Sequence, residues 1–415
     1  MNYIYNFAIY LFGLILRLMA LFNNKIKLFV EGRKETFPKL LTSIKPSDKT
    51  FWIHCASLGE FEQGRPIIEA LRKTRPNHKI ILTFYSPSGY EVQKQSELAD
   101  VIAYLPIDSA SNAKKFIEVC HPSMAIFVKY EFWPNILKEL KIKAIPTILI
   151  SGIFRKDQIF FQAYGAWMRR ALHAFTHFFV QNADSDSLLK NIGFTNTTIS
   201  GDTRFDRVAS ILDQDNHLDF LTEFTKDKTV MVSGSTWPVD EAYLIKFINQ
   251  QKDKNVRFII APHNIDNKEI LKLRQSIIKK TALYSEGIPD PEAAVFIVDI
   301  IGLLTKIYSY ADFAYVGGGF EKEGVHNVLE PAVFGIPLVI GPIYDKFLEA
   351  RDLVNLKGCL VANTNEELNQ IFEKLIMEPE FRQKLGKINE IYITDHLGAT
   401  KIILDFIHYK VQDIS

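Results

Sequence analysis

The sequence has little of the chemistry that marks several common protein classes. Its 415 residues include three cysteines, which stand far apart in no metal-binding spacing: Cys55, Cys120 and Cys359. We expect them to be small buried hydrophobic residues in a reducing compartment, with no disulfide framework and no structural zinc. The 49 basic and 48 acidic residues leave a formal net charge of +1. A nucleic-acid partner is therefore not expected, because such proteins usually show a clear basic excess.

Repeats of short period and low-complexity segments are also absent, which excludes solenoid and disordered classes. What is present is ordinary for a globular body, with 47% hydrophobic and 23% charged residues. A prior of about 150 residues per domain predicts two large domains or three smaller ones.

The N-terminus is unusually apolar. The twenty residues 3–22 are apolar except for Asn6, Gly13 and Arg17, and roughly 20 such residues are needed to cross a bilayer. No basic segment precedes the run and no good cleavage site follows it, so a removed signal peptide is not expected. We expect a membrane anchor that either spans the bilayer or lies in its interface; a soluble helix docked on the body is the alternative.

Basic residues follow the apolar run at once: Lys25, Lys27, Arg33 and Lys34. Basic residues stay on the cytoplasmic side of a membrane, so the body of the chain is expected to face the cytoplasm at the cell inner membrane. Such a basic collar is also typical of a segment that lies close to anionic lipids.

Short apolar runs then alternate with helical patterns in two series. The first series of expected strands is 51–56, 79–85, 101–106, 124–128, 145–151 and 177–181, and the second is 229–235, 256–262, 294–299, 313–318 and 337–342. This alternation predicts an α/β fold with two doubly wound, Rossmann-like domains. Ligands bind such sheets beyond the carboxyl ends of their strands.

Glu60 follows the first expected strand, at the carboxyl end where ligands bind. A carboxylate there can take a proton from an attacking hydroxyl, which contributes typically 10²- to 10⁴-fold in rate. Ser57 and Glu60 also have the spacing of a helix capping box. Pro66 favours the first interpretation, because a helix that began at Leu58 would hold this proline in its interior. The residues 57–64 would then form an exposed loop, and sequence alone leaves the two interpretations even.

A glycine-bearing segment follows a strand of the second series. After Gly317, Gly318 and Gly319, a helix is expected to open near His326 and Asn327. Glycines let a backbone approach a ligand closely, and the N–H groups at a helix start favour phosphate. Glu330, three residues on, would share the helix face of Asn327 and accept from ribose hydroxyls. A tight turn with capping polar residues is the structural alternative, and the pattern lacks the spacing of a nicotinamide-dinucleotide site.

Together these stretches resemble the 3-deoxy-D-manno-octulosonic acid (Kdo) transferases, over nearly the whole chain. The family landmarks occur in order: the apolar N-terminus, SLGEFEQGRPII (57–68), SPSG (86–89), EFWPN (131–135), GDTRFD (201–206), GSTW (234–237), PH (262–263), HNVLEP (326–331) and GPIYDKF (341–347). The resemblance implies a GT-B fold and an inverting transfer of Kdo from CMP-Kdo to the lipid A precursor lipid IVA. It implies no metal and no cofactor.

The resemblance also implies roles for individual residues. Glu60 matches the general base. The expected donor-binding residues are Arg204, Ser235, Thr236, His263, Gly318, Gly319, His326, Asn327 and Glu330. The expected acceptor-binding or supporting residues are Ser57, Gly59, Arg65, Glu131, Asn135 and Arg155. Of these, Arg65 and Arg155 are named for their charge, which suits acceptor phosphates, and a solvated surface arginine is the alternative for each. Three motifs depart from the family pattern. Where the family often has GSTH, this chain has Trp237 in place of the histidine. Where the family has PRH, the chain has Ala261, Pro262 and His263, and where the family has GGHN, it has Gly324 and Val325 before His326.

Five segments are expected: an anchor over 1–24, an acceptor-binding domain over 25–205, a linker over 206–226, a CMP-sugar-binding domain over 227–380, and a C-terminal helix over 381–415 that returns to the first domain. Two alternatives remain open. One is another two-Rossmann sugar-nucleotide enzyme, either a uridine-donor transferase or an epimerase. The other is a catalytically idle binding protein tethered to a membrane.

Overall fold

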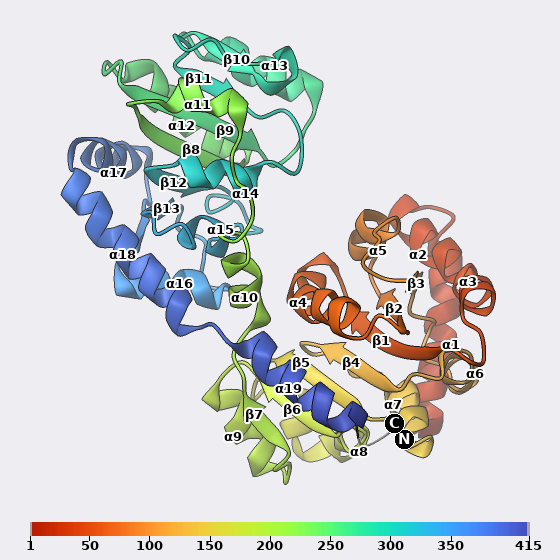
Figure 1. Ribbon diagram of the computed structural model, residues 1–415. Helices are drawn as coiled ribbons and strands as arrows, with labels where there is room; N and C mark the ends of the chain where they lie inside the picture. Colours follow the sequence, from red (N-terminus) through yellow and green to blue (C-terminus); the bar gives the residue numbers. More distant parts are fainter. Residues whose placement is uncertain (1, 413–415) are drawn as a thin grey trace. The chain divides into compact units, whose positions relative to one another are not determined.

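The computed structural model describes residues 2–412, so Met1 and residues 413–415 of the expected end segments lie outside the described residues. The chain forms two compact units (Figure 1), one of residues 1–207 with 397–415 and one of residues 208–396. The division falls inside one short helix, α10 (Thr203–Ala209). Each unit is built around its own seven-stranded sheet.

The first unit contains a parallel sheet in the order β3-β2-β1-β4-β5-β6-β7. Its strands are β1 (Lys49–Cys55), β2 (His78–Phe84), β3 (Val101–Tyr104), β4 (Met124–Val128), β5 (Thr147–Gly152), β6 (His177–Val180) and β7 (Thr197–Ile199). The strands bury nearly every residue, as parallel strands covered on both faces do.

Helices cover both faces of this sheet. They are α1 (Asn2–Met19), α2 (Asn24–Lys34), α3 (Thr36–Ser43), α4 (Leu58–Thr74), α5 (Pro87–Gln93), α6 (Ala110–Cys120), α7 (Pro134–Ile142), α8 (Ala166–Leu172) and α9 (Ala183–Asn191). The C-terminal helix α19 (Ala399–Gln412) returns to this unit and buries Ile403 and Ile407 against the core that α4 also covers. Phe406 adds a ring contact with Phe179 of β6.

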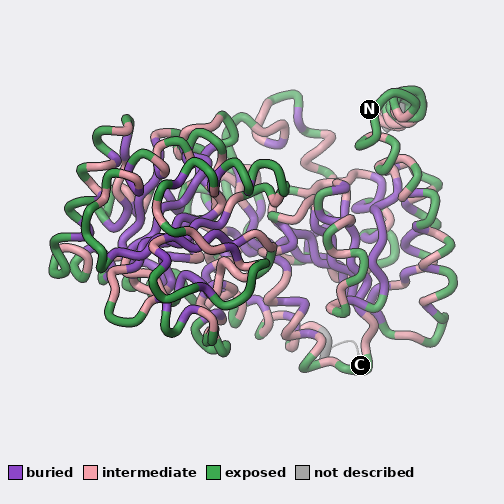
Figure 2. The backbone as a smooth tube through the Cα atoms, turned by 90° about the horizontal axis from the view of Figure 1, so that it is seen from above, coloured by how far each residue is buried: buried purple, intermediate pink, exposed green. Residues whose placement is uncertain are grey.

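The second unit contains a parallel sheet in the order β10-β11-β9-β8-β12-β13-β14. Its strands are β8 (Thr229–Thr236), β9 (Val256–Pro262), β10 (Thr281–Leu283), β11 (Val295–Ile297), β12 (Phe313–Val316), β13 (Leu338–Ile340) and β14 (Cys359–Val361). Its helices are α11 (Asp219–Thr225), α12 (Pro238–Gln250), α13 (Asn267–Ser276), α14 (Leu304–Ile307), α15 (Leu329–Ala332), α16 (Leu348–Leu356), α17 (Asn365–Met377) and α18 (Pro379–Asp395). The buried residues of both units, purple in Figure 2, gather along the strands.

The α/β class, the doubly wound sheets and the eleven expected strands are confirmed. Three further strands were not predicted: β7, β10 and β14, each of three residues. All three are edge strands. All three cysteines are buried, as expected.

The N-terminal helix α1 is attached to the first unit by polar contacts. Tyr5 donates its hydroxyl hydrogen to Asp108 (2.8 Å), and Asn6 accepts a hydrogen bond from Asn135 (2.8 Å). Its other faces are apolar and exposed, including Ile4, Phe7, Leu11, Ile15 and Leu18. No helix within residues 2–412 is both long enough and apolar enough to cross a membrane.

Candidate functional site

Glu60 lies in the first turn of α4, directly beyond the carboxyl end of β1. The helix begins at Leu58 with Ser57 at its N-cap and carries Pro66 in its interior. The expectation of an exposed loop over 57–64 is therefore wrong. A proline in a helix interior removes one backbone hydrogen bond and crowds the preceding turn; here the helix keeps it while burying Phe61, Ile67 and Ile68 in the core.

The capping box is not formed either. The Ser57 side chain makes no cap hydrogen bond to the backbone; it donates instead to Oε2 of Glu60. Nζ of Lys129 lies 3.8 Å from Oε1 of the same carboxylate. Glu60 is only 5% exposed, yet a Cβ added to its exposed neighbour Gly59 would meet only Ser57 Oγ, at 3.8 Å. A hydroxyl-bearing ligand can therefore approach this turn without a steric barrier at Gly59.

Glu131 belongs to the same region of the first unit. Its Oε2 accepts from the indole of Trp133 (3.0 Å) and lies 3.4 Å from Nε2 of the fully buried His54. Nδ1 of His54 in turn contacts Thr83 Oγ1 at 2.9 Å. Glu131 is thus held by two ring nitrogens.

Tyr130 connects Glu131 with Glu60 electrostatically. Burial raises the pKa of Tyr130, the two carboxylates raise it further, and the Arg155 guanidinium opposes them. Arg155 is exposed and near enough to act on this hydroxyl. The cluster of Glu60, Lys129, Tyr130 and Glu131 combines a proton acceptor with one cation, Lys129, that can meet an anionic acceptor.

The other expected acceptor residues have different partners. Asn135 is buried at the start of α7, where its backbone N–H donates to Asp108 (3.0 Å). Arg65 is paired with Glu69 one helical turn away (2.7 Å).

Gln63 and the expected donor-binding residue Arg204 both donate to the buried carboxylate of Asp202, at 2.9 Å each. Arg204 is thus positioned within the first unit.

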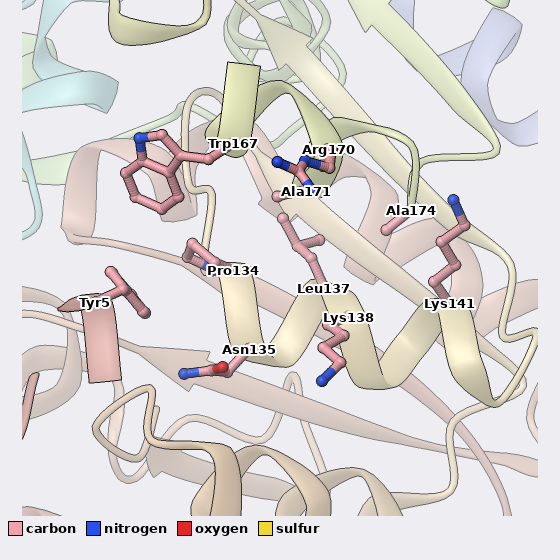
Figure 3. A pocket seen from close by; sticks show the side chains of 10 residues that line it. All are labelled: Tyr5, Pro134, Asn135, Leu137, Lys138, Lys141, Trp167, Arg170, Ala171 and Ala174. Carbon is pink, nitrogen blue, oxygen red and sulfur yellow. The ribbon is translucent and has the colours of Figure 1, made fainter. Parts of the chain in front are cut away.

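Asn135 also lines a cavity between α1, α7 and α8 (Figure 3) of about 140 Å³. Tyr5 and Trp167 form one wall, with their ring centroids 5.8 Å apart. Three cations line the rest: Lys138, Lys141 and Arg170. Burial raises the pKa of Asp108 beneath Tyr5 to about 6, although three hydrogen bonds favour its ionised form.

In the second unit, β12 ends in closely packed glycines. A Cβ on Gly317 would lie 2.4 Å from the Ser235 carbonyl oxygen, and one on Gly319 would lie 2.5 Å from the Gly341 nitrogen. Gly318 has a φ of 89°, in the left-handed region that glycine adopts without strain. Ser235 adopts a left-handed φ of 54° without being glycine. Such backbone conformations are costly and cluster at ligand sites.

The helix expected near His326 begins later and is shorter. α15 spans only Leu329–Ala332, so the helix starts two residues beyond Asn327 and is a single short turn. The Asn327 side chain organises the turn instead. Its Oδ1 accepts from the Leu329 N–H (3.1 Å), and its Nδ2 donates to Glu330 Oε1 (2.9 Å). Thr305 donates to the other Glu330 oxygen (3.1 Å).

Three rings stack beside this turn. Trp237 lies over His263 (centroids 4.8 Å apart), and His263 lies over His326 (4.4 Å). The Trp237 indole donates to Nε2 of His326 at 2.7 Å. His263 also donates its backbone N–H to the Thr236 carbonyl (2.9 Å). The structure thus brings together His263, His326 and the 234–236 turn.

Sequence reasoning missed the residues beneath this turn. Asp240, fully buried in α12, accepts from Tyr315 (2.5 Å) and from the backbone N–H groups of Trp237 and Gly318 (2.9 Å each). Burial raises the pKa of Asp240 and takes that of Glu241 to about 7. Their only sequence signal was an acidic pair in the first turn after Pro238. Lys129 was missed too, because nothing local marks it.

Residues 31–207 match the model of a family described as 3-deoxy-D-manno-octulosonic-acid transferase (kdotransferase). The 3-deoxy-D-manno-octulosonic acid transferase of Aquifex aeolicus is 27% identical over 371 residues, which cover 88% of this chain and 96% of that protein. The enzyme of the same name from Haemophilus influenzae is 25% identical over 382 residues, which cover 87% of each chain. The chain is thus similar to Kdo transferases along most of its length.

Kdo transferases are glycosyltransferases of lipopolysaccharide biosynthesis, and that class applies to this chain. Among solved structures, the UDP-GlcNAc 2-epimerase from Neisseria meningitidis bound to UDP-GlcNAc superposes with a TM-score of 0.61 at 16% identity, covering 87% of this chain and all of that one. This likeness concerns the fold alone. Trp237, where the resemblance favours histidine, is a departure with a defined partner in His326.

Proposed function

We propose that this protein transfers Kdo from CMP-Kdo to lipid IVA with inversion at the anomeric carbon. The acceptor hydroxyl oxygen forms a bond to that carbon, the bond from the carbon to the CMP phosphate breaks, and the hydroxyl proton passes to Glu60. CMP leaves as the phosphomonoester. Glu60 is the proposed catalytic residue, and holding the reactants in position supplies much of the remaining rate.

The observation that supports this most is the turn at Ser57–Glu60. A nearly buried carboxylate stands beyond the end of a central strand, with open space at Gly59 and a cation 3.8 Å away. Ser57 donates to one carboxylate oxygen and limits its rotation. Burial also limits how far water competes for the carboxylate as a proton acceptor.

The second unit is proposed to hold the donor. Asn327 and Glu330 fix each other, so the amide and the carboxylate are already oriented for a nucleotide. His326 and the strained turn at Ser235 stand beside the close-packed glycines, where backbone can approach a phosphate. Arg204 remains a candidate for the Kdo carboxylate, oriented by Asp202.

We further propose that α1 lies in the interface of the cytoplasmic leaflet and brings the first unit to its lipid acceptor. Its exposed Ile4, Phe7 and Leu18 are each at least 64% exposed, on a helix whose opposite side is docked by Tyr5 and Asn6. A contiguous apolar surface of this kind favours a membrane or a partner protein. The cations of the cavity in Figure 3 suit the phosphates of a lipid headgroup.

The test is mass spectrometry of lipid IVA after incubation with CMP-Kdo and the purified full chain. One or more added Kdo residues and released CMP are the expected products. Glu60→Gln serves as the inactive control, and UDP-sugars replace CMP-Kdo in a parallel reaction. Turnover of a UDP-sugar with none of CMP-Kdo would replace this proposal with the uridine-donor alternative, and no turnover of either would favour an idle binding protein.

A further inference from the structure

The contact between Trp237 and His326 fixes where His326 carries its proton. Nε1 of Trp237 lies 2.7 Å from Nε2 of His326. An indole nitrogen donates and never accepts, so Nε2 of His326 must offer its lone pair. In a neutral imidazole the single proton then resides on Nδ1. This assignment follows because the indole N–H can only donate a hydrogen bond.

The surrounding atoms hold both rings in this arrangement. Trp237 and His326 lie 11° from parallel, with His263 stacked against each of them. The backbone N–H of His326 donates to the Gly317 carbonyl (3.1 Å). A Cβ on Gly318 would lie 2.9 Å from Cδ2 of His326, so glycine at 318 leaves the ring its place.

We propose that Trp237 is a positioning residue that locks His326 in the Nδ1–H tautomer, so that this N–H binds the phosphodiester of the sugar nucleotide. The inference rests on the proposed donor site and deepens it. A neutral donor suits the single negative charge of the phosphodiester in CMP-Kdo. The neutral N–H adds no cationic attraction to the second negative charge that the phosphate of CMP gains when CMP leaves. The release of CMP is therefore easier.

Titratable groups from three elements surround His326. His263 faces it from the end of β9, Asp240 lies beneath the glycine turn from α12, and Glu330 follows on α15. Burial, and to a lesser extent the neighbouring His263, lower the pKa of His326 to about 4. The ring therefore stays neutral from about pH 5.5 upward, and its Nδ1–H is available throughout that range.

The first experiment records the ring-nitrogen signals of His326 by NMR in the full chain labelled with ¹⁵N-histidine. At pH 7.5 we expect a protonated Nδ1 and a lone pair on Nε2. In Trp237→Phe, which keeps an aromatic ring over His263, the signals move toward an average of the two tautomers. Trp133→Phe is the matched control, because Trp133 donates to Nε2 of a different histidine, His54 (3.3 Å); it leaves the His326 signals unchanged.

The second experiment measures affinity for cytidine 5′-(methyl phosphate), a phosphodiester with one charge at every pH used. CMP itself is unsuitable, because its phosphate loses a second proton near pH 6. Trp237→Phe should weaken this ligand roughly 3- to 10-fold at pH 8, the worth of one hydrogen bond. The loss should shrink toward pH 5.5, because the freed imidazole protonates more readily, while wild-type affinity stays flat.

A protonated Nε2 in the wild-type protein, or identical ring signals in Trp237→Phe, would overturn the role of Trp237. No binding of the phosphodiester by the wild-type protein would overturn the donor site on which the inference rests. These failures are distinguishable, because the NMR signals are read without any ligand.

Discussion

Nζ of Lys129 lies 3.8 Å from Oε1 of Glu60, and Lys129 reaches this position with a left-handed φ of 71°. The residue directly follows β4, so the strained backbone and the cation occur together at the carboxyl end of the sheet. A non-glycine residue in this region costs of order 1–2 kcal/mol. The backbone strain thus places the ammonium beside the proposed base, where it can act on the carboxylate.

Lys129→Gly and Lys129→Ala separate the cation from the backbone strain. Both remove the ammonium, so turnover should fall about 10-fold in each, the worth of a modest charge interaction. Glycine accepts the left-handed φ and alanine does not, so the glycine variant should be more stable by about 1 kcal/mol. Steady-state kinetics and urea denaturation check the two parts. Turnover at the wild-type rate in Lys129→Gly would deny the cation any role.

Glu60→Gln tests the proposed base. Glutamine keeps the size of the side chain and can still accept from Ser57, so the melting temperature should change little. It cannot accept a proton from the acceptor hydroxyl, so turnover should fall by about 10²-fold or more. Glu62→Gln is the control in the same helix, since Glu62 lies 3.5 Å from Arg207 and belongs to another ion pair. Near-normal turnover in Glu60→Gln together with a large loss in Glu62→Gln would transfer the role to Glu62.

Asn327→Ala and Asn327→Asp test donor binding. Both remove the amide donor, but aspartate keeps an oxygen that can accept from the Leu329 N–H and so preserves the turn. Calorimetric titration with CMP should show a loss of about 10- to 150-fold in both variants, with the larger loss for aspartate because it adds a negative charge beside Glu330. Weakening by alanine with none by aspartate would reduce Asn327 to a cap.

His326 should make stability fall in mild acid. Because its pKa in the folded protein is lowered to about 4, the unfolded chain takes up the proton first, near pH 6.5. The stability gained from the neutral ring is present above pH 6.5 and disappears as the pH falls toward 4. Denaturant unfolding at pH 7.5 and 4.5 should show wild type losing about 1–2 kcal/mol more than His326→Gln, allowing for partial solvent screening. Equal losses would contradict the lowered pKa.

The exposed face of α1 can be tested without deleting it. Phe7→Ser with Leu18→Ser should weaken binding to vesicles of phosphatidylcholine and phosphatidylglycerol, by about 10-fold or more from the apolar area lost. The matched control is Ile288→Ser with Ile301→Ser, which changes two apolar residues of the second unit that are more exposed than Phe7 and Leu18. Flotation assays measure both. Equal loss of vesicle binding in the two double variants, or no loss in either, would show that α1 does not bind the membrane.

Deletion of residues 1–22 should release the protein from the membrane and leave both units folded.

The central strands were predictable because each is a run of buried β-branched and aromatic residues. The missed strands are not of this kind: β7 has no buried residue, and β10 has one. Edge strands of three residues are specified by their neighbours in the sheet, which no local pattern reveals. The same holds for Lys129 and Asp240, whose partners stand 69 and 78 positions away along the chain.

Local rules failed where tertiary contacts outweighed them. Pro66 favoured a late start of α4. However, a Cβ added to Gly64 would lie 3.1 Å from Sγ of Cys55, so the first turns of this helix pack closely against β1. At Asn327, polar residues after glycines suggested a helix start, whereas the side chain satisfies the turn by itself. The place of Glu60 directly beyond a strand could be predicted, since that place depends only on chain order.

The return of α19 to the first unit has a consequence for biosynthesis. Ile403 and Ile407 complete a core whose other members precede residue 180, and Asp206 holds the entry to α19 through the N–H groups of Gly398 and Thr400. A chain emerging from the ribosome at about 5–20 residues per second delivers the whole second unit before this helix appears. The first unit is therefore translated first but completed last. The apolar face that Ile403 and Ile407 cover stays without α19 for tens of seconds. That interval is when a chaperone would be needed most.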